Sequence, residues 1–333
     1  MSCRESAFSD RDNVRLDDCL PGGGCDSVAG EIIAGLAGAE KHISCVHFYD
    51  AAGSRLFEQI THLPEYYPTR IEKELLRKVS LEIGGKLGGA DIIEFGSGDC
   101  SKISILLEAV PPREIETIRY VPVEISRSAI RRSAAILCRS FPGLQIHGVI
   151  ADFTKHLSRV PGGARRLFCF LGGTIGNFSR ARSVEFMRNL RELMDTDDRL
   201  LVGFDMVKDT GVLERAYNDS RLVTAAFNKN ILKAVNAKAG TDFDPDVFEH
   251  LAFYNEEQCR IEMRLRALED VEISFPHPPG RIFIARGETI HTENSHKYTQ
   301  GHIADLASRA GLAIERTYTD ENKWYSLVLF TPG

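Results

Sequence analysis

Short apolar runs alternate with amphipathic stretches along the middle of the chain. Residues 91–95, 118–125 and 147–153 are rich in β-branched and aromatic side chains, a composition typical of strands. Residues 166–171 and 199–205 are also mainly apolar, which indicates strands of a parallel sheet that is covered on both faces. The stretches between them carry apolar residues at helical spacing. This alternation predicts an α/β three-layer sandwich whose ligand site lies at the carboxyl ends of the strands.

The pattern changes after these runs. Residues 210–237 are mostly helical in character, and residues 259–266 alternate polar and apolar side chains as a half-buried strand does. Residues 281–285 are the expected partner strand. A helix over 301–310 and a closing strand over 324–330 then return to the first pattern. These elements predict a second, smaller α+β lobe that interrupts the α/β domain.

The expected elements divide the chain into two lobes and an arm. Residues 1–24 are polar and end in a glycine-rich stretch, so we expect a flexible N-terminal arm. Residues 71–207 and 298–333 are expected to form the α/β domain, and residues 25–70 and 208–297 the smaller lobe. A ligand pocket is expected between the lobes, because small molecules often bind at such boundaries.

Composition and charge restrict the classes of function. Of the 333 residues, 43% are hydrophobic and 26% are charged, which is ordinary for a globular enzyme. The formal net charge of −6 argues against nucleic-acid binding. No apolar stretch approaches the ~20 residues that span a bilayer, and the polar N-terminus is unlike a signal peptide. We therefore expect a monomeric cytoplasmic protein that acts on a small molecule.

The eight cysteines are scattered, with no Cys-x-x-Cys pair and no zinc-like spacing of cysteine and histidine. In a chain of this size, such a distribution predicts reduced thiols and no metal site. Cys100 and Cys169 stand beside or within apolar runs, so we expect them to be packing residues rather than nucleophiles.

A glycine turn follows the first strand-like run. Residues 94–98 read Glu-Phe-Gly-Ser-Gly, and a helical pattern begins near Lys102. Strand, glycine turn and helix form the opening unit of a doubly wound nucleotide-binding sheet, although Gly96 and Gly98 could also form a turn without a ligand. The third glycine of the dinucleotide fingerprint is replaced by Ser101, which argues against a pyrophosphate. An adenosine ligand without phosphates fits better, and S-adenosylmethionine is the common one.

Acidic residues stand near the ends of the next two strand-like runs. Glu124 lies 26 residues beyond Gly98, close to the ~20-residue spacing expected of an acid that holds a ribose. Asp152 can accept a hydrogen bond from an adenine amino group, and the ring of Phe153 can pack on the base. Together with the turn at Ser97 and Gly98, these residues predict a site for the adenosyl group.

The chemistry of methyl transfer directs attention to the fourth strand end. A sulfonium gives up its methyl in line, so the enzyme mainly has to position a neutral nucleophile. The amide of Asn177 could accept from an amine or donate to a carboxylate, although it could also cap the helix that follows or simply occupy a turn. Tyr49, Tyr67 and Tyr217 could make similar contacts through their hydroxyls, or could be core residues.

Residues 290–298 are densely polar and lie between a predicted strand and a predicted helix. Within them, Glu293 and Ser295 could bind a polar or cationic part of a substrate. The alternative is a solvated loop in which Thr292 or Ser295 caps the helix.

Several of these segments resemble one family. They are residues 49–57 (Tyr-Asp to Leu-Phe), 63–70 (Leu-Pro-Glu-Tyr-Tyr-Pro-Thr-Arg), 94–98, 172–178 (Gly-Gly-Thr-Ile-Gly-Asn-Phe) and 292–298 (Thr-Glu-x-Ser-x-Lys-Tyr). The chain is similar in them to the histidine Nα-methyltransferases of ergothioneine biosynthesis. The resemblance implies a Rossmann-like class I methyltransferase fold and transfer of three methyls from S-adenosylmethionine to the α-amine of L-histidine. The implied product is Nα,Nα,Nα-trimethylhistidine (hercynine).

The resemblance also implies roles for individual residues. The cofactor positions, with the glycine turn, are Gly96, Ser97, Gly98, Lys102, Glu124, Asp152, Phe153 and Gly172. The positions that hold the amino-acid amine and carboxylate, and so serve catalysis, are Tyr67, Asn177 and Tyr217. Glu293 and Ser295 match the imidazole-binding positions. The remaining substrate positions are Tyr49, Phe57, Thr224 and Met263.

Two positions depart from the family pattern. The ribose-binding acid is usually Asp, and here it is Glu124; the residue between Glu293 and Ser295 is often Ile or Val, and here it is Asn294. The second change leaves room for another substrate, such as arginine, whose guanidinium also suits Glu293, or a tryptophan derivative. No general base is evident, and the α-ammonium could lose its proton directly to water.

Overall fold

The computed structural model describes residues 4–7, 13–20, 25–163, 165–277 and 279–333. The chain forms two compact units. The first unit contains residues 1–20, 68–207 and 296–333. The second contains residues 21–67 and 208–295.

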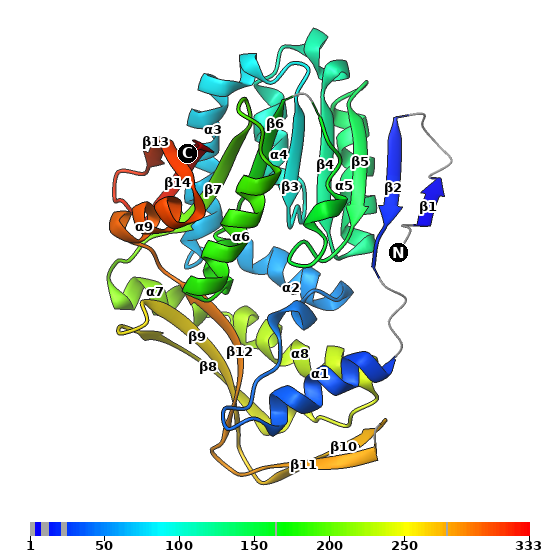
Figure 1. Cartoon of the computed structure of the whole chain (residues 1–333). Helices are drawn as coiled ribbons and strands as arrows, with labels where there is room; N and C mark the ends of the chain where they lie inside the picture. Colours follow the sequence, from blue (N-terminus) through cyan, green and yellow to red (C-terminus); the bar gives the residue numbers. More distant parts are fainter. Residues whose placement is uncertain (1–3, 8–12, 21–24, 164, 278) are drawn as a thin grey trace. The chain divides into compact units, whose positions relative to one another are not determined.

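The first unit is built on a nine-stranded sheet with the order β1-β2-β5-β4-β3-β6-β7-β14-β13 (Figure 1). Its strands are β1 (Arg4–Ala7), β2 (Val14–Asp18), β3 (Asp91–Phe95), β4 (Arg119–Glu124), β5 (Gln145–Ile150), β6 (Arg166–Phe170), β7 (Arg199–Asp205), β13 (Leu312–Thr319) and β14 (Tyr325–Pro332). The strands from β2 to β7 in this order are mutually parallel. The outer strands β1, β13 and β14 are antiparallel to their neighbours.

Helices cover both faces of this sheet (Figure 1). They are α3 (Tyr67–Ile83), α4 (Ser101–Glu108), α5 (Arg127–Ser140), α6 (Arg180–Leu193) and α9 (Gln300–Ala310). Alternate strand residues share a face, so Ile93, Phe95, Phe168 and Phe170 all enter one core, to which α6 and α9 contribute their apolar faces. The predicted Rossmann-like α/β sandwich is therefore confirmed.

The order of the strands defines where a ligand can bind. From β3 the chain proceeds through β4 and β5 to one side, and then through β6 and β7 to the other. The reversal places a topological switch point between β3 and β6. In open parallel sheets, ligands bind at such a point, outside the carboxyl ends of the strands.

The N-terminal segment differs from the flexible arm predicted over residues 1–24. Val14–Asp18 form β2, which extends the sheet beside β5, and Leu16 is buried against Ile130 and Ile150. Burial of this side chain gives the segment a fixed place in the sheet. Residues 1–3, 8–12 and 21–24 of the expected arm lie outside the described residues. Cys19 is disulfide-bonded, contrary to the expectation that all thiols are reduced.

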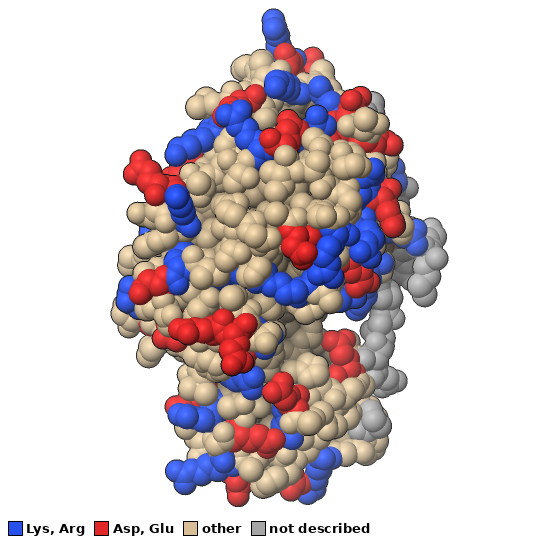
Figure 2. All heavy atoms as spheres, turned by 60° about the vertical axis from the view of Figure 1, so that its left-hand side comes forward, with Lys and Arg blue, Asp and Glu red and all other residues tan. Residues whose placement is uncertain are grey.

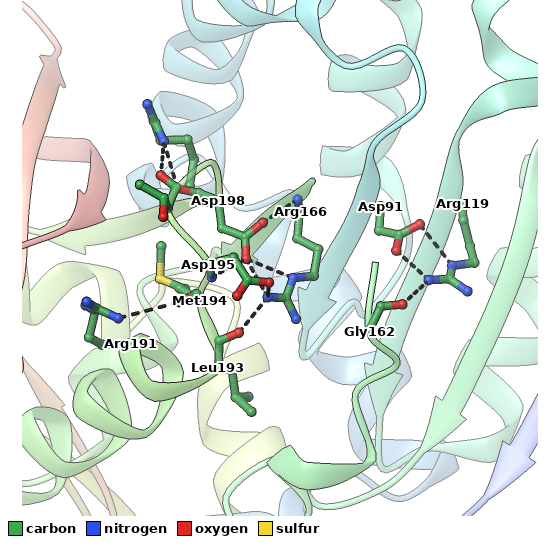
Figure 3. A network of polar contacts seen from close by, with 11 residues as sticks. Asp91, Arg119, Gly162, Arg166, Arg191, Leu193, Met194, Asp195 and Asp198 are labelled. Atoms are coloured by element: carbon green, nitrogen blue, oxygen red, sulfur yellow. Dashed lines mark hydrogen bonds and ion pairs between the residues drawn. The ribbon is translucent and has the colours of Figure 1, made fainter. Parts of the chain in front are cut away.

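An ion-pair network lies at the amino ends of the parallel strands, away from the carboxyl ends where a ligand is expected (Figure 3). Asp198 is fully buried, and its carboxylate accepts from the backbone and the side chain of Arg166 at 2.7 and 2.8 Å. Asp195 contacts the same guanidinium from an exposed position. Asp91 and Arg119 pair nearby at the starts of β3 and β4. Because these contacts tie strand starts together, we assign them to stability rather than to ligand binding.

The second unit combines helices with a three-stranded sheet and a hairpin. Its helices are α1 (Cys25–Ala37), α2 (Ala51–Thr61), α7 (Thr210–Tyr217) and α8 (Val223–Ala239). The sheet has the order β12-β9-β8 and consists of β8 (Phe248–Asn255), β9 (Arg260–Ala267) and β12 (Thr289–His296). The hairpin pairs β10 (Val271–Pro276) with β11 (Pro279–Ile284). Among the described residues, no helix is both long and apolar enough to cross a membrane.

One expectation and one alternative for this unit are wrong. The strand expected over 281–285 is β11, which ends at Ile284 and pairs with β10. The strand expected over 259–266 has β8 and β12 as its neighbours instead. The polar segment over 290–298, for which a solvated loop was the alternative, is mostly strand β12. A polar side chain of this strand finds its partners within the unit, since the buried hydroxyl of Thr292 donates to Asn228 at 2.7 Å or to the carbonyl of Met263 at 3.0 Å. The short 3-10 helices of the two units are η1 (Cys45–Phe48), η2 (Gly84–Lys86), η3 (Pro112–Thr117), η4 (Leu157–Arg159), η5 (Thr174–Asn177) and η6 (Pro245–Val247).

Candidate functional site

The turn after β3 is shaped by left-handed backbone. Gly96, Gly98 and Cys100 have φ values of 69°, 56° and 59°. The two glycines adopt this conformation without the strain that a side chain would add. The hydroxyl of Ser97 is buried and has no hydrogen-bond partner in the part of the chain that the structure describes. The turn therefore offers a polar atom and close access to its backbone.

Glu124 connects the ends of β3 and β4. Its carboxylate accepts from the backbone N–H of Gly98 at 3.3 Å and from that of Ser126 at 2.9 Å. Burial raises the pKa of Glu124, while these backbone hydrogen bonds oppose the rise. The acid thus lies directly beside the glycine turn, as a ribose-binding residue must.

Asp152 and Phe153 follow β5, also at the carboxyl ends of the parallel strands. The Oδ1 atom of Asp152 accepts from the backbone and the hydroxyl of Thr154, at 3.0 and 2.6 Å. Phe153 packs on Phe95 with ring centroids 6.1 Å apart. A Cβ on Gly96 would stand 3.6 Å from the ring of Phe153, so the glycine keeps the space near that ring open. The predicted adenosyl residues are therefore neighbours in the first unit.

A buried acid that the sequence did not single out lies near Lys102 and Gly172. Glu72 of α3 has no exposed surface. It contacts the ammonium of Lys102 at 2.9 Å and accepts from the backbone N–H of Gly172 at 2.7 Å and the hydroxyl of Tyr325 at 2.8 Å. No spacing could have revealed it, because an acid near the start of an amphipathic helix is ordinarily exposed.

Asn177 ends η5, in the connection from β6 to α6. The N-cap of α6 is Ser179, whose side chain accepts from the backbone of Arg182, so the alternative role of Asn177 as this cap is wrong. The backbone of η5 is held by His296, whose ring Nδ1 is 2.9 Å from the carbonyl oxygen of Gly176. Asn177 is therefore placed on a supported turn that follows the fourth parallel strand of the predicted core.

In the second unit, Tyr217 and Ser295 are in direct contact. The hydroxyl of Tyr217 donates to the hydroxyl oxygen of Ser295 at 2.8 Å, and both side chains are buried. The residues lie on α7 and β12, 78 positions apart in the sequence. Ser295 is thus a strand residue and not the helix cap considered as an alternative; the cap of α9 is Thr299. Glu293 lies two residues earlier on β12 and is partly buried.

The remaining aromatic candidates form a connected cluster. Phe57 packs edge-on against Tyr49 at 6.4 Å and against Tyr66 at 6.3 Å, and Tyr66 packs against Tyr217 at 6.4 Å. Tyr67, also buried, accepts a 2.7 Å hydrogen bond from Lys208, whose ammonium lies 4.3 Å from its ring centroid. This arrangement brings Tyr49, Phe57 and Tyr217 together through Tyr66, a residue that the sequence analysis did not single out.

Thr224 and Met263 are buried in the same unit. The backbone N–H of Thr224 donates to Asp219 at 2.7 Å near the start of α8. Met263 lies on β9, and its carbonyl is within hydrogen-bonding distance of Thr292 on β12. Both residues therefore flank elements that carry the candidate substrate residues.

Comparison with known proteins decides the family. Residues 28–332 match the family described as histidine-specific, S-adenosylmethionine-dependent methyltransferases. The chain belongs to this family.

Individual relatives support the assignment along nearly the whole chain. The chain is 42% identical to a histidine N-alpha-methyltransferase of Mycolicibacterium smegmatis, over 87% of this chain and 90% of that protein. It is 39% identical to the histidine N-alpha-methyltransferase of Mycobacterium tuberculosis, over 90% and 93% of the two chains. A 4-dimethylallyltryptophan N-methyltransferase of Arthroderma benhamiae is 25% identical, over 89% and 91%.

The residues of this methyltransferase fit the methyl donor of the family. The buried hydroxyl of Ser97 lacks a partner in the described chain, and Gly96 keeps open the space beside Phe153. An acid, Glu124, stands next to the turn. Across the described ranges, no group of three or more His, Cys, Asp or Glu side chains could hold a metal ion.

Figure 2 shows acidic and basic side chains interspersed on the face that it presents.

Glu94 is a second buried acid at the carboxyl end of β3. The hydroxyl of Tyr120 donates to it at 2.6 Å. Burial raises the pKa of Glu94 from 4.5 to about 8, although the hydrogen bond from Tyr120 and the charge of Lys102 oppose the rise. Burial also raises the pKa of Tyr120. The neutral acid is therefore the form that this methyltransferase stabilises on folding.

Replacement of Glu94 by glutamine is expected to flatten the dependence of stability on pH. Because the pKa of Glu94 is raised, the neutral acid contributes stability that is fully present below about pH 4.5 and is lost as the pH rises towards about 8. Glutamine stays neutral, so E94Q should not lose this stability. Between pH 5 and pH 8 the free energy of unfolding of E94Q should rise relative to that of the parent by on the order of 3 kcal/mol. Urea unfolding across that range measures the difference, and parallel curves for the two proteins would contradict it.

Proposed function

We propose that this chain transfers three methyls from S-adenosylmethionine to the α-amine of L-histidine in the cytoplasm. The product is hercynine, and the reaction is the first step of ergothioneine biosynthesis. The observation that carries the proposal is the buried hydrogen bond from Tyr217 to Ser295, two residues from Glu293 on β12. The relatives named as histidine N-alpha-methyltransferases support the choice of substrate.

The polarity of that hydrogen bond suits an imidazole. Tyr217 donates to Ser295, so we assign the proton of the serine hydroxyl to an acceptor on the bound substrate. A neutral imidazole can accept from Ser295 through one nitrogen and donate to Glu293 through the other. Few side chains can satisfy both groups, and a site built on such bonds can reject analogues by ~10⁴ or more.

The amino-acid end of the substrate is assigned to Tyr67, Asn177 and Tyr217. An amide can bind both an amine and a carboxylate, and the Tyr217 hydroxyl, which donates its proton to Ser295, can still accept from the amine. The ammonium of Lys208, 2.7 Å from the Tyr67 hydroxyl, adds positive charge that favours a carboxylate nearby.

The donor supplies an electrophilic methyl on a positively charged sulfur. Gly96, Glu124, Asp152 and Phe153 are proposed to hold its adenosyl group, with Ser97, Gly98, Lys102 and Gly172 around them. The protein then has to present the amine, after loss of a proton, in line with the sulfur–methyl bond. The amide oxygen of Asn177 can accept an N–H of this amine and so direct its lone pair. Repetition of the step with a second donor adds the second methyl. The neutral dimethylated amine has no N–H left to give to Asn177, so it takes the third methyl through its lone pair without this contact.

A tryptophan derivative is the second candidate, because the chain is also similar to a 4-dimethylallyltryptophan N-methyltransferase. Asn294 is the residue whose departure from the family pattern left room for another substrate. Its side-chain oxygen lies 2.9 Å from Nε2 of His291. That partner gives Asn294 a structural role of its own, so the residue does not by itself favour the second candidate or arginine.

The substrate is tested by incubating the purified protein with S-adenosylmethionine and, in turn, histidine, arginine and 4-dimethylallyltryptophan. Mass spectrometry should detect mono-, di- and trimethylhistidine and no methylated product from the other two. Methylation of arginine or of the tryptophan derivative without methylation of histidine would overturn the proposal.

A further inference from the structure

Glu72 bridges the topological switch point. Lys102 belongs to α4, which follows β3, and Gly172 follows β6; these two strands are neighbours in the sheet. Glu72 holds both residues, at 2.9 Å from the Lys102 ammonium and 2.7 Å from the Gly172 nitrogen. The acid therefore fixes the two sides of the crevice in which a ligand of such a sheet binds.

The surroundings of Glu72 are built to keep it in place. A Cβ on Gly203 would lie 2.3 Å from its Oε1 atom and 2.5 Å from the Tyr325 hydroxyl, so only glycine fits there. A Cβ on Gly172 would lie 2.7 Å from the Lys102 ammonium. A buried carboxylate is costly unless it is paired and hydrogen-bonded, and Glu72 receives three such contacts.

The exposure of these residues shows which of them can meet a ligand. The Glu72 side chain is 0% exposed, whereas that of Lys102 is 21% exposed. A ligand at this edge can therefore reach Lys102 but not Glu72. The ammonium suits the carboxylate of an amino acid, and the methionine part of the donor carries one.

We propose that Glu72 is a positioning residue for the amino-acid end of the methyl donor. It holds the Lys102 ammonium and the Gly172 backbone at the switch point, and Lys102 binds the carboxylate of the donor. This inference rests on the proposed function in placing the donor at the carboxyl ends of β3 and β6.

The test compares two nucleosides that differ only beyond the sulfur. S-Adenosylhomocysteine has the amino-acid end, and 5′-methylthioadenosine lacks it. In E72Q, the glutamine can still accept from Gly172 and Tyr325, but its amide then presents a donor to Lys102 and displaces the ammonium. Calorimetry should show S-adenosylhomocysteine binding weakened roughly tenfold or more and 5′-methylthioadenosine binding within about twofold of the parent.

Two further variants separate positioning from a general structural role. Y325F removes another donor to the same carboxylate but leaves the contacts to Lys102 and Gly172, so it should leave the ratio of the two affinities unchanged. If Glu72 acts through Lys102, the double variant E72Q/K102M should bind S-adenosylhomocysteine no more weakly than K102M alone.

Equal weakening of both nucleosides in E72Q, or additive losses in the double variant, would overturn the positioning role. Binding of S-adenosylhomocysteine by the parent without methylation of histidine would count against the proposed substrate and leave this test intact. Binding of neither nucleoside by the parent would overturn both proposals.

Discussion

Replacement of Glu293 by alanine is expected to raise the KM for histidine by about a hundredfold or more. The change removes a charged acceptor from the imidazole and leaves an N–H of the bound substrate without a partner, a loss of about 3 kcal/mol. Steady-state kinetics at saturating S-adenosylmethionine measure the effect. Because Glu293 lies in the second unit and the adenosyl residues lie in the first, affinity for S-adenosylhomocysteine should stay within about twofold.

The neighbouring residue provides a matched control. Asn294 lies on the same strand and is within hydrogen-bonding distance of His291, so N294A should change the KM for histidine only a few-fold. Equal effects of E293A and N294A would show that damage to β12, rather than a lost contact with imidazole, is responsible. A matching loss of S-adenosylhomocysteine affinity in E293A would contradict the assigned role.

Replacement of Asp198 by alanine is expected to lower the free energy of unfolding by about 3–5 kcal/mol. Asp198 is fully buried, and its removal leaves the 8%-exposed guanidinium of Arg166 without its main partner. The carboxylate of Asp198 accepts one hydrogen bond from the backbone of Arg166, one from its side chain and one from the backbone of Asp195, and all three are lost. Denaturant unfolding, followed through the transition of the first unit, measures the change in the free energy of unfolding.

Asp195 is the control for this change, because it contacts the same guanidinium through a side chain that is 77% exposed. D195A should cost about 0–1 kcal/mol, as exposed ion pairs do. Both variants should bind S-adenosylhomocysteine normally while folded, since the network lies at the starts of the parallel strands (Figure 3). Comparable destabilisation by the two substitutions would contradict the dependence on burial.

The α/β domain could be predicted because its signal is local. Apolar runs that are buried on both faces, such as β6 and β7, are distinctive in a single sequence. The helix α6 lies between these two strands in the sequence and has a regular apolar face. The glycine turn then marks the strand that opens the nucleotide-binding unit.

The elements that were missed depend on partners distant in the sequence. β12 is polar, and its buried Thr292 is satisfied by Asn228, 64 residues away. β2 is short and has a single well-buried side chain, Leu16, which offers no periodic pattern. β11 pairs with β10, a strand that we did not anticipate. Tertiary contacts decide such segments, and local composition does not contain them.

The candidate site divides in the same way. The acids at strand ends could be found from position alone, and Glu124 indeed contacts the turn at Gly98. Their roles with ligands stay predictions. Glu72 could not be found, and the burial of Glu94, which begins the Glu-Phe-Gly-Ser-Gly segment, could not be foreseen, because a buried acid is recognised only by its partners. The contact between Tyr217 and Ser295 also joins distant segments, and only the fold brings them together.

A crystal structure of the protein with S-adenosylhomocysteine and histidine tests the central claim most directly. We predict the ribose hydroxyls at Glu124, the adenine beside Asp152 and Phe153, and the imidazole between Glu293 and Ser295. The homocysteine carboxylate should lie within hydrogen-bonding distance of Lys102. An adenosyl group bound away from the ends of β3, β4 and β5, or an imidazole that contacts neither Glu293 nor Ser295, would contradict the account.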